Sequence, residues 1–133
     1  RTRSEVALRE SEAWLRHLAD ALPILVWAAA PDGQVDYGNE AWRRYAGGTD
    51  AADWLRVVHP EDADRLRVRW ADAVQARARF EARVRLRRAE DGTYRWHSVR
   101  AVPVSAPHGG LIRWVGAFID DHELRMLVEA NQH

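Results

Sequence analysis

The chain has 133 residues, of which 47% are hydrophobic and 30% charged, a composition typical of one globular domain rather than a disordered segment. Its 20 basic residues, all arginine, equal its 20 acidic residues, which argues against a general polyanion binder. Cysteine is absent, which excludes disulfides, thiolate metal sites and cysteine nucleophiles.

The first stretch, residues 5–22, has a helical pattern. Its leucines recur at spacings of seven, three and four, at Leu8, Leu15, Leu18 and Leu22. Ser4 is a suitable N-cap, and Pro23 ends the pattern. One interpretation is an amphipathic helix packed on its own domain, and the other is a dimer-forming helix that continues an upstream coiled coil. The two are compatible if different turns serve each purpose.

Two short strands follow, over residues 24–29 and 34–37. Between them stand Pro31, Asp32 and Gly33, which suit a tight turn because proline presets its own φ and glycine accepts positive φ.

Three helices are then predicted, over residues 40–46, 49–58 and 60–75. Asn39 would cap the first helix, and Gly47 would help to end it. Pro60 suits the first position of the third.

From residue 78 the hydrophobic period changes to two. Phe80, Ala82, Val84 and Leu86 alternate with charged residues, which predicts a strand with one buried and one exposed face. Two longer strands are predicted within residues 92–121, and a helical pattern resumes over residues 123–131. Strands at both ends of a helical middle predict an α+β domain with one antiparallel sheet.

At this point the sequence resembles a known family, the PAS sensor domains, over roughly residues 10–123. The subtype it resembles has a His-Pro-Glu-Asp turn and an Arg-Trp strand and is common in bacterial histidine kinases. The residues that carry the resemblance are Ser11-Glu12, Leu22-Pro23, Trp27, Pro31-Asp32-Gly33, Asn39, Trp42, His59-Pro60-Glu61-Asp62, the run Asp91 to Trp96, Pro103-Val104, Gly110, Arg113-Trp114-Val115-Gly116 and Asp120.

The resemblance implies a PAS fold, a five-stranded antiparallel sheet in the order 2-1-5-4-3 with helices on one face and a flanking N-terminal helix. It divides the chain into a flanking or dimerisation helix (1–22), a PAS core (23–121) and the start of a C-terminal signalling helix (122–133). Family members usually leave the last strand through an Asp-Ile-Thr-like triplet. Here Asp120 is followed by Asp121 and His122, so we expect the usual hydrogen-bonded junction to be altered.

Catalytic and metal sites are not expected. His59, Glu61, Asp62 and Asp64 form an acidic cluster with one histidine, but a proline-started helix with acidic residues in its first turn explains them better than a metal or acid–base site. No His-Glu-x-x-His pair, nucleophile elbow or phosphate-binding loop is present.

The arginine-rich stretch of residues 77–88 is the best case for nucleic acid. We interpret it instead as the solvated side of a strand, because acidic residues dilute it and we expect no aromatic residue on the same face.

The family resemblance also implies a cavity between the helices and the sheet. The candidate lining residues are Trp27, Tyr37, Tyr45, Trp70, Val84, His97, Val99 and Phe118, with His97 and Tyr37 as the polar contacts of any ligand. Haem is disfavoured because the long helix has no histidine, and a photoadduct-forming flavin because the chain has no cysteine. Large rings more often fill such a space than frame it, so a packed core without a ligand is favoured, and the identity of any cofactor stays open.

The resulting expectation is a sensory and dimerisation module of a multidomain bacterial signalling protein, a histidine kinase in the first instance, which relays a ligand or partner signal to an output domain. The alternatives are a stand-alone small-molecule binding domain and a purely structural interaction module. The chain begins with Arg1, so we expect it to be a piece of a longer protein. No apolar run approaches the roughly 18 residues of a membrane span and no signal peptide pattern is present, so we expect a cytoplasmic module without membrane contact.

Overall fold

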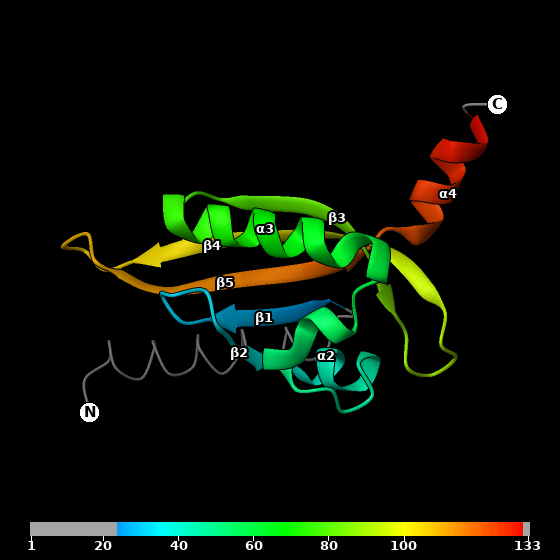
Figure 1. The fold of residues 1–133 in the computed structure, drawn as a ribbon, viewed down its shortest axis with the longest axis horizontal. Helices are drawn as coiled ribbons and strands as arrows, with labels where there is room; N and C mark the ends of the chain where they lie inside the picture. Colours follow the sequence, from blue (N-terminus) through cyan, green and yellow to red (C-terminus); the bar gives the residue numbers. More distant parts are fainter. Residues whose placement is uncertain (1–23, 132–133) are drawn as a thin grey trace, which may run out of the picture.

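The computed structural model describes residues 24–131, and the helix expected over residues 5–22 lies outside them, together with Leu8, Leu15, Leu18 and Leu22. The described elements are drawn in Figure 1. They are β1 (Leu25–Ala29), β2 (Val35–Gly38), α2 (Glu40–Tyr45), η1 (Ala51–Arg56), α3 (Pro60–Ala76), β3 (Phe80–Arg87), β4 (Tyr94–Ser105), β5 (Leu111–Asp120) and α4 (His122–Asn131).

The five strands form one antiparallel sheet in the order β2-β1-β5-β4-β3, which confirms the α+β class and the predicted strand order. The last strand in the sequence, β5, therefore lies in the centre between β1 and β4. Since α4 follows β5 directly, the centre of the sheet leads into the C-terminal helix.

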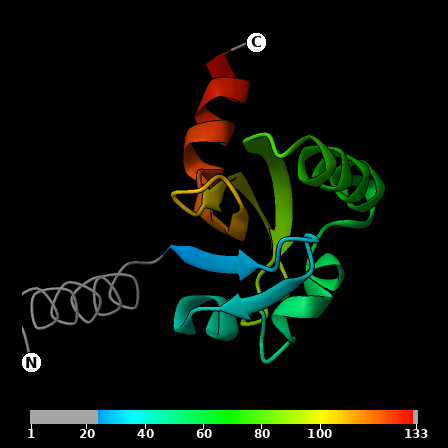
Figure 2. The same ribbon diagram turned by 90° about the vertical axis from the view of Figure 1, so that its left-hand side faces the viewer.

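One face of the sheet is buried beneath α2, η1 and α3. His97, Val99 and Phe118, which the family resemblance implied as cavity-lining residues, lie on the buried side of β4 and β5, together with Ala101 and Gly116. Trp42 from α2 and Leu66 and Trp70 from α3 pack against them. Figures 1 and 2 show that α4, in contrast, projects away from the body of the domain.

The predicted ends of α2 and the predicted start of α3 are confirmed. The Asn39 side chain accepts a hydrogen bond from the Trp42 backbone N–H at 3.0 Å and so caps α2. Gly47, with a φ of 64°, follows the C-cap of that helix in the left-handed conformation that glycine favours. Pro60 begins α3, and the His59 ring accepts from the Glu61 N–H at 3.0 Å.

Two local expectations were wrong. The helix predicted over residues 49–58 is a six-residue 3-10 helix, η1, interrupted by non-helical backbone angles at Asp53. It ends before Val58, which forms a bridge with Leu86 on β3 instead. Tyr37 was expected to point inward, but it is 45% exposed. Asp36 is an extra residue in β2, and the pairing of β2 with β1 shifts there. The alternation of buried and exposed positions is therefore interrupted after the buried Val35, and Tyr37 is exposed.

Candidate functional site

Tryptophan side chains fill the space where the family resemblance implied a ligand cavity. What remains is a cavity of about 20 Å³, enough for about one water molecule and too small for an organic ligand. Its lining consists of Trp27, Val35, Trp42, Ala51, Trp54, Leu66, Trp70, Phe80, Val99 and Phe118.

The rings of this aromatic core pack edge to face around Trp70. The centroid of Trp70 lies 5.3 Å from that of Trp27 and 5.1 Å from that of Trp114, with interplanar angles of 86° and 72°. The Trp70 indole N–H donates to the Gly33 carbonyl at 3.0 Å. The indole N–H groups of Trp27 and Trp42 are buried and have no acceptor within the described part of the chain, which costs about 1–3 kcal/mol for each group.

Of the predicted lining residues, only Trp27, Trp70, Val99 and Phe118 line this cavity. Val84 is fully buried but does not line it. Tyr45 and His97 line a separate groove at the end of β5. Neither His97 nor Tyr37, the expected polar contacts of any ligand, is among the residues that line this cavity, and their contact with a ligand stays a prediction.

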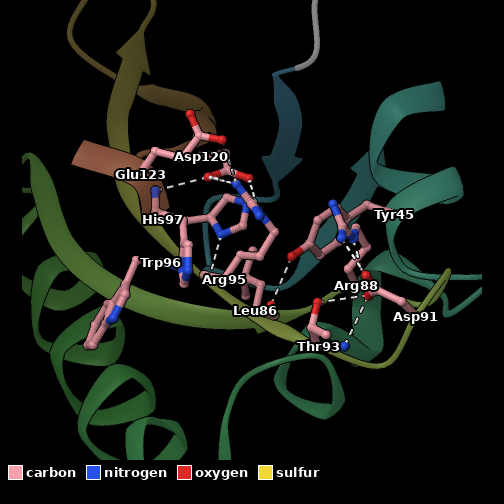
Figure 3. Close-up of polar contacts among 11 residues, drawn as sticks. Tyr45, Leu86, Arg88, Asp91, Thr93, Arg95, Trp96, His97, Asp120 and Glu123 are labelled. Carbon is pink, nitrogen blue, oxygen red and sulfur yellow. Dashed lines mark hydrogen bonds and ion pairs between the residues drawn. The ribbon is translucent and has the colours of Figure 1, made fainter. Parts of the chain in front are cut away.

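His97 is a buried structural histidine. Its Nδ1 lies 2.9 Å from the Arg95 carbonyl, which can only accept, so Nδ1 carries the proton. The ring packs at right angles to Tyr45, at a centroid distance of 5.3 Å (Figure 3). Burial lowers the pKa of His97 and raises the pKa of Tyr45, whose hydroxyl donates to the Leu86 carbonyl at 2.8 Å. Both side chains are therefore held neutral.

The exit from β5 to α4 is a compact polar junction around Asp120. One carboxylate oxygen accepts from Arg95 Nε at 2.6 Å, and the other accepts from the His122 backbone N–H at 3.0 Å (Figure 3). Burial alone would raise the pKa of Asp120, but the bonds to Arg95 and His122 outweigh it, so the pKa lies below its usual value. A charged Asp120 thus ties β4 to the first turn of α4.

Asp121 and His122 extend this exit junction through hydrogen bonds to Trp96 and Ser98 of β4. The Asp121 N–H donates to the Trp96 carbonyl at 3.1 Å, and the Trp96 N–H donates to His122 Nδ1 at 3.1 Å. The Ser98 hydroxyl donates to the Asp121 carboxylate at 2.5 Å. The unusual Asp-Asp-His exit was expected to alter the junction, but these residues rebuild a fully hydrogen-bonded one.

Trp96 connects the exit helix to the helical layer. Two guanidinium groups lie over its ring, those of Arg85 on β3 at 5.1 Å and Arg125 on α4 at 5.3 Å from the ring centroid. Arg85 in turn donates to the buried Asp62 carboxylate at the start of α3. The sequence did not predict these contacts. Asp62 was interpreted only as an acidic residue that suits the first turn of a helix, and its pairing with Arg85 was not expected.

Trp96 also corrects the interpretation of the arginine-rich strand. No aromatic residue was expected on that face, yet Trp96 stands opposite Arg85 in the sheet register. The guanidinium groups of Arg85 and Arg125 already contact this ring and compete with a base for its π surface. Within residues 24–131, no cluster of three or more acidic or histidine side chains is placed to hold a metal ion. None of the helices in that range has the length and apolar character needed to cross a membrane.

Known proteins resemble the chain in sequence. A family model described as PAS fold matches residues 35–118. The uncharacterized protein y4lL of Sinorhizobium fredii is 31% identical over 130 residues, and the peroxide stress-activated histidine kinase mak1 of Schizosaccharomyces pombe is 29% identical over 139 residues. These matches cover 96% and 95% of this chain but only 16% and 8% of the two relatives, so the chain spans a small part of their length.

Solved structures share the fold at lower identity. The N-terminal domain of a diguanylate cyclase with PAS/PAC sensor from Marinobacter aquaeolei has a TM-score of 0.64 at 19% identity, over 77% of this chain and 98% of that one. A sensory box histidine kinase/response regulator from Burkholderia thailandensis has a TM-score of 0.63 at 18% identity, over 89% and 92%. At these identities the likeness concerns the fold alone.

Proposed function

This chain belongs to the PAS family, and we propose that it is the sensory and dimerisation module of a cytoplasmic bacterial histidine kinase. In this proposal it relays a signal to an output domain of the same protein. The resemblance to mak1 and to the Burkholderia thailandensis protein, both histidine kinases, supports the kinase context.

The exit junction is the observation that carries the proposal. Asp120, at the end of the central strand, holds Arg95 of β4 and the first N–H of α4 at once. A displacement of β4 relative to β5 would therefore change the hydrogen bonds that fix the start of α4. Such a shift transmits a signal only if the two arrangements differ in free energy and the signal favours one of them.

The filled core favours a partner, rather than a resident ligand, as the source of that signal. The remaining cavity of about 20 Å³ has no room for a cofactor-sized molecule. Native mass spectrometry of the purified protein tests this point. A bound small molecule in the intact mass would restore the alternative of a small-molecule binding domain.

Dimerisation is proposed on two features. The leucines Leu8, Leu15, Leu18 and Leu22 form the apolar stripe predicted from the sequence. The outer face of the sheet exposes Val102, Val115 and Ile119, each about two-fifths exposed or slightly more, and Val102 lies opposite Val115. Sedimentation velocity tests the dimer, and a chain that stays monomeric at high concentration, with its upstream sequence present, would contradict it.

The relay is tested in the full-length protein by its ATP-dependent autophosphorylation. Asp120→Asn removes the charge that holds Arg95, and Asp36→Asn removes a comparable ion pair with Arg113 at the other end of β5. We expect D120N to change the phosphorylation rate by about five-fold or more, the lower end of typical coupling energies, and D36N to leave it unchanged.

Two outcomes would contradict different parts of the proposal. A full-length protein that does not incorporate phosphate from ATP would refute the kinase context. Equal phosphorylation rates in the wild-type protein, D120N and D36N would refute the relay through Asp120, while leaving the kinase context intact.

A further inference from the structure

A basic groove lies along the β3 edge of the sheet, between α3 and α4. It has a volume of about 510 Å³ and is open to solvent along one side. Its walls come from α3, β3, β4 and α4, and it is lined by Arg65, Arg69, Glu81, Ala82, Arg83, Trp96, Ser98, Val99, Arg100 and Arg125. Five of these ten residues are arginines, and one is acidic.

Two of the arginines are fixed in place by the edge of the sheet. Arg65 donates to the Arg83 carbonyl at 2.9 Å, and Arg69 donates to the Glu81 carbonyl at 2.8 Å. These carbonyls belong to β3, the edge strand, and would otherwise be free to pair with another strand. A guanidinium group has five N–H donors, so both arginines keep further donors for a ligand.

The other guanidinium groups of the groove are weakly neutralised. Arg100 lies 3.7 Å from Glu81, in a pair whose side chains are both about 70% exposed, and Arg125 lies 3.4 Å from Glu129. The Arg83 side chain has no ion-pair partner among residues 24–131. Arg65 also lies 3.7 Å from the Asp62 carboxylate. Most of the positive charge of this groove is thus weakly paired, although the whole chain has equal numbers of acidic and basic residues.

We propose that this groove binds an acidic segment of a protein partner. Its arginines border β4 from Trp96 to Arg100, a distance of about 13 Å at the usual rise of a strand. That length matches several successive carboxylates of a peptide better than one small anion. Single-stranded nucleic acid fits less well, because Trp96 is the one aromatic residue among the ten that line the groove, and two guanidinium groups already contact its ring.

The position of the groove gives such binding a consequence for α4. Arg125 belongs to α4, whereas Arg65 and Arg69 belong to α3. An acidic segment in the groove contacts both helices at once and favours the arrangement in which Arg125 stays against Trp96. This inference does not depend on the kinase context, because it concerns a surface of the domain and not the reaction of the output domain.

The test uses a fluorescein-labelled poly-glutamate peptide and measures its binding to the protein by fluorescence anisotropy at low salt. Arg83→Glu places a negative charge in the groove. Arg56→Glu makes the same charge change on η1, where Arg56 is exposed and outside the groove. We expect R83E to weaken binding by about five-fold or more and R56E by less than about two-fold.

Two further measurements complete the design. Arg83→Gln removes the charge without reversing it, so we expect an intermediate loss of peptide binding. Circular dichroism shows whether R83E and R83Q are folded, and R83Q keeps the test valid if R83E is not. In the NMR spectrum, the Trp96 indole signal, assigned by its absence in W96F, shifts when the peptide binds. Equal losses in R83E and R56E would overturn the proposal, as would tighter, R83E-sensitive binding of a poly-uridine RNA.

Discussion

The carboxylate of Asp62 and the arginine Arg85 form a three-point contact between α3 and β3. Asp62 is 5% exposed and accepts from the Arg85 backbone N–H at 2.9 Å, from Nε at 3.1 Å and from a terminal nitrogen at 2.9 Å. One side chain thus satisfies an edge-strand N–H and fixes the guanidinium that stacks on Trp96. Burial would raise the pKa of Asp62, but these bonds outweigh it and hold the pKa below its ordinary value of 3.8.

Asp62→Asn is expected to lower the free energy of unfolding by about 2 kcal/mol at neutral pH, since Arg85 remains a quarter exposed and is partly solvated. Because the folded pKa is depressed, the ionised Asp62 contributes stability above about pH 4, and this contribution is lost as the pH falls through the folded pKa. Urea unfolding of D62N should therefore show a weaker acid dependence below pH 4 than the wild-type protein.

The matched control is Glu61→Gln. Glu61 also pairs with Arg85, at 3.1 Å, but its side chain is 75% exposed, so the loss should stay within about 0.5 kcal/mol. If both variants lost the same free energy, the buried contact would not be the source of the effect.

The second prediction concerns His97 and the pH range near neutrality. Burial lowers the pKa of His97. The Arg95 carbonyl and the carboxylates of Asp120 and Asp121 act in the opposite direction, but the effect of burial is larger, and the pKa lies below its ordinary value. The unfolded chain therefore binds more protons than the folded one below the ordinary pKa of 6.5, and stability falls as the pH drops through this range. The slope for one proton is at most about 1.4 kcal/mol per pH unit.

His97→Asn should reduce this slope, because asparagine can donate to the Arg95 carbonyl and does not titrate. The measurement is the free energy of unfolding at a series of pH values between 5 and 8. His108→Asn, in the exposed turn between β4 and β5, should keep the wild-type slope. A slope that survives in H97N would assign the pH dependence to another group.

The third prediction concerns the tight contact between the Trp27 ring and the backbone of β5 at Gly116. A Cβ atom on Gly116 would lie 2.3 Å from the Trp27 ring, which is far too close for two carbon atoms. Gly116→Ala should lower the free energy of unfolding by about 1–3 kcal/mol through overpacking. Gly110→Ala, where the nearest atom is 3.5 Å away on an exposed histidine, should cost less than about 0.5 kcal/mol. Equal losses in the two variants would contradict the tight contact.

The fold could be predicted from the sequence because its signals are local. The period-two alternation of Phe80 to Leu86, the caps at Asn39 and Pro60 and the glycine stop at Gly47 each depend on a few neighbouring residues. The strand order came from the family resemblance and not from the residues alone. The bulge at Asp36 was not predictable, since one inserted residue leaves the apolar pattern of a four-residue strand unchanged.

The candidate site was predicted less well, because its contacts join residues far apart in the sequence. Asp62 and Arg85 are 23 positions apart, and Trp96 and His122 are 26 positions apart. The family resemblance implied that His97 faces inward, and the side chain is buried as expected. Its hydrogen bond to Arg95 and its separation from the cavity depend on how the tryptophans pack. The same sequence pattern allows several packing arrangements of the aromatic rings in the core, so the pattern alone does not determine which residues line the cavity.

The last prediction concerns His122, whose ring holds the start of α4 against β4. His122 Nδ1 accepts from the Trp96 N–H at 3.1 Å. His122→Ala removes this acceptor, which costs about 1 kcal/mol and should speed amide hydrogen exchange in the first turns of α4 about five-fold. His122→Asn should restore slow exchange, because its side-chain oxygen lies close to the position of Nδ1. His108→Ala is the control, and equal exchange in H122A and H122N would show that the ring acts by packing and not as an acceptor.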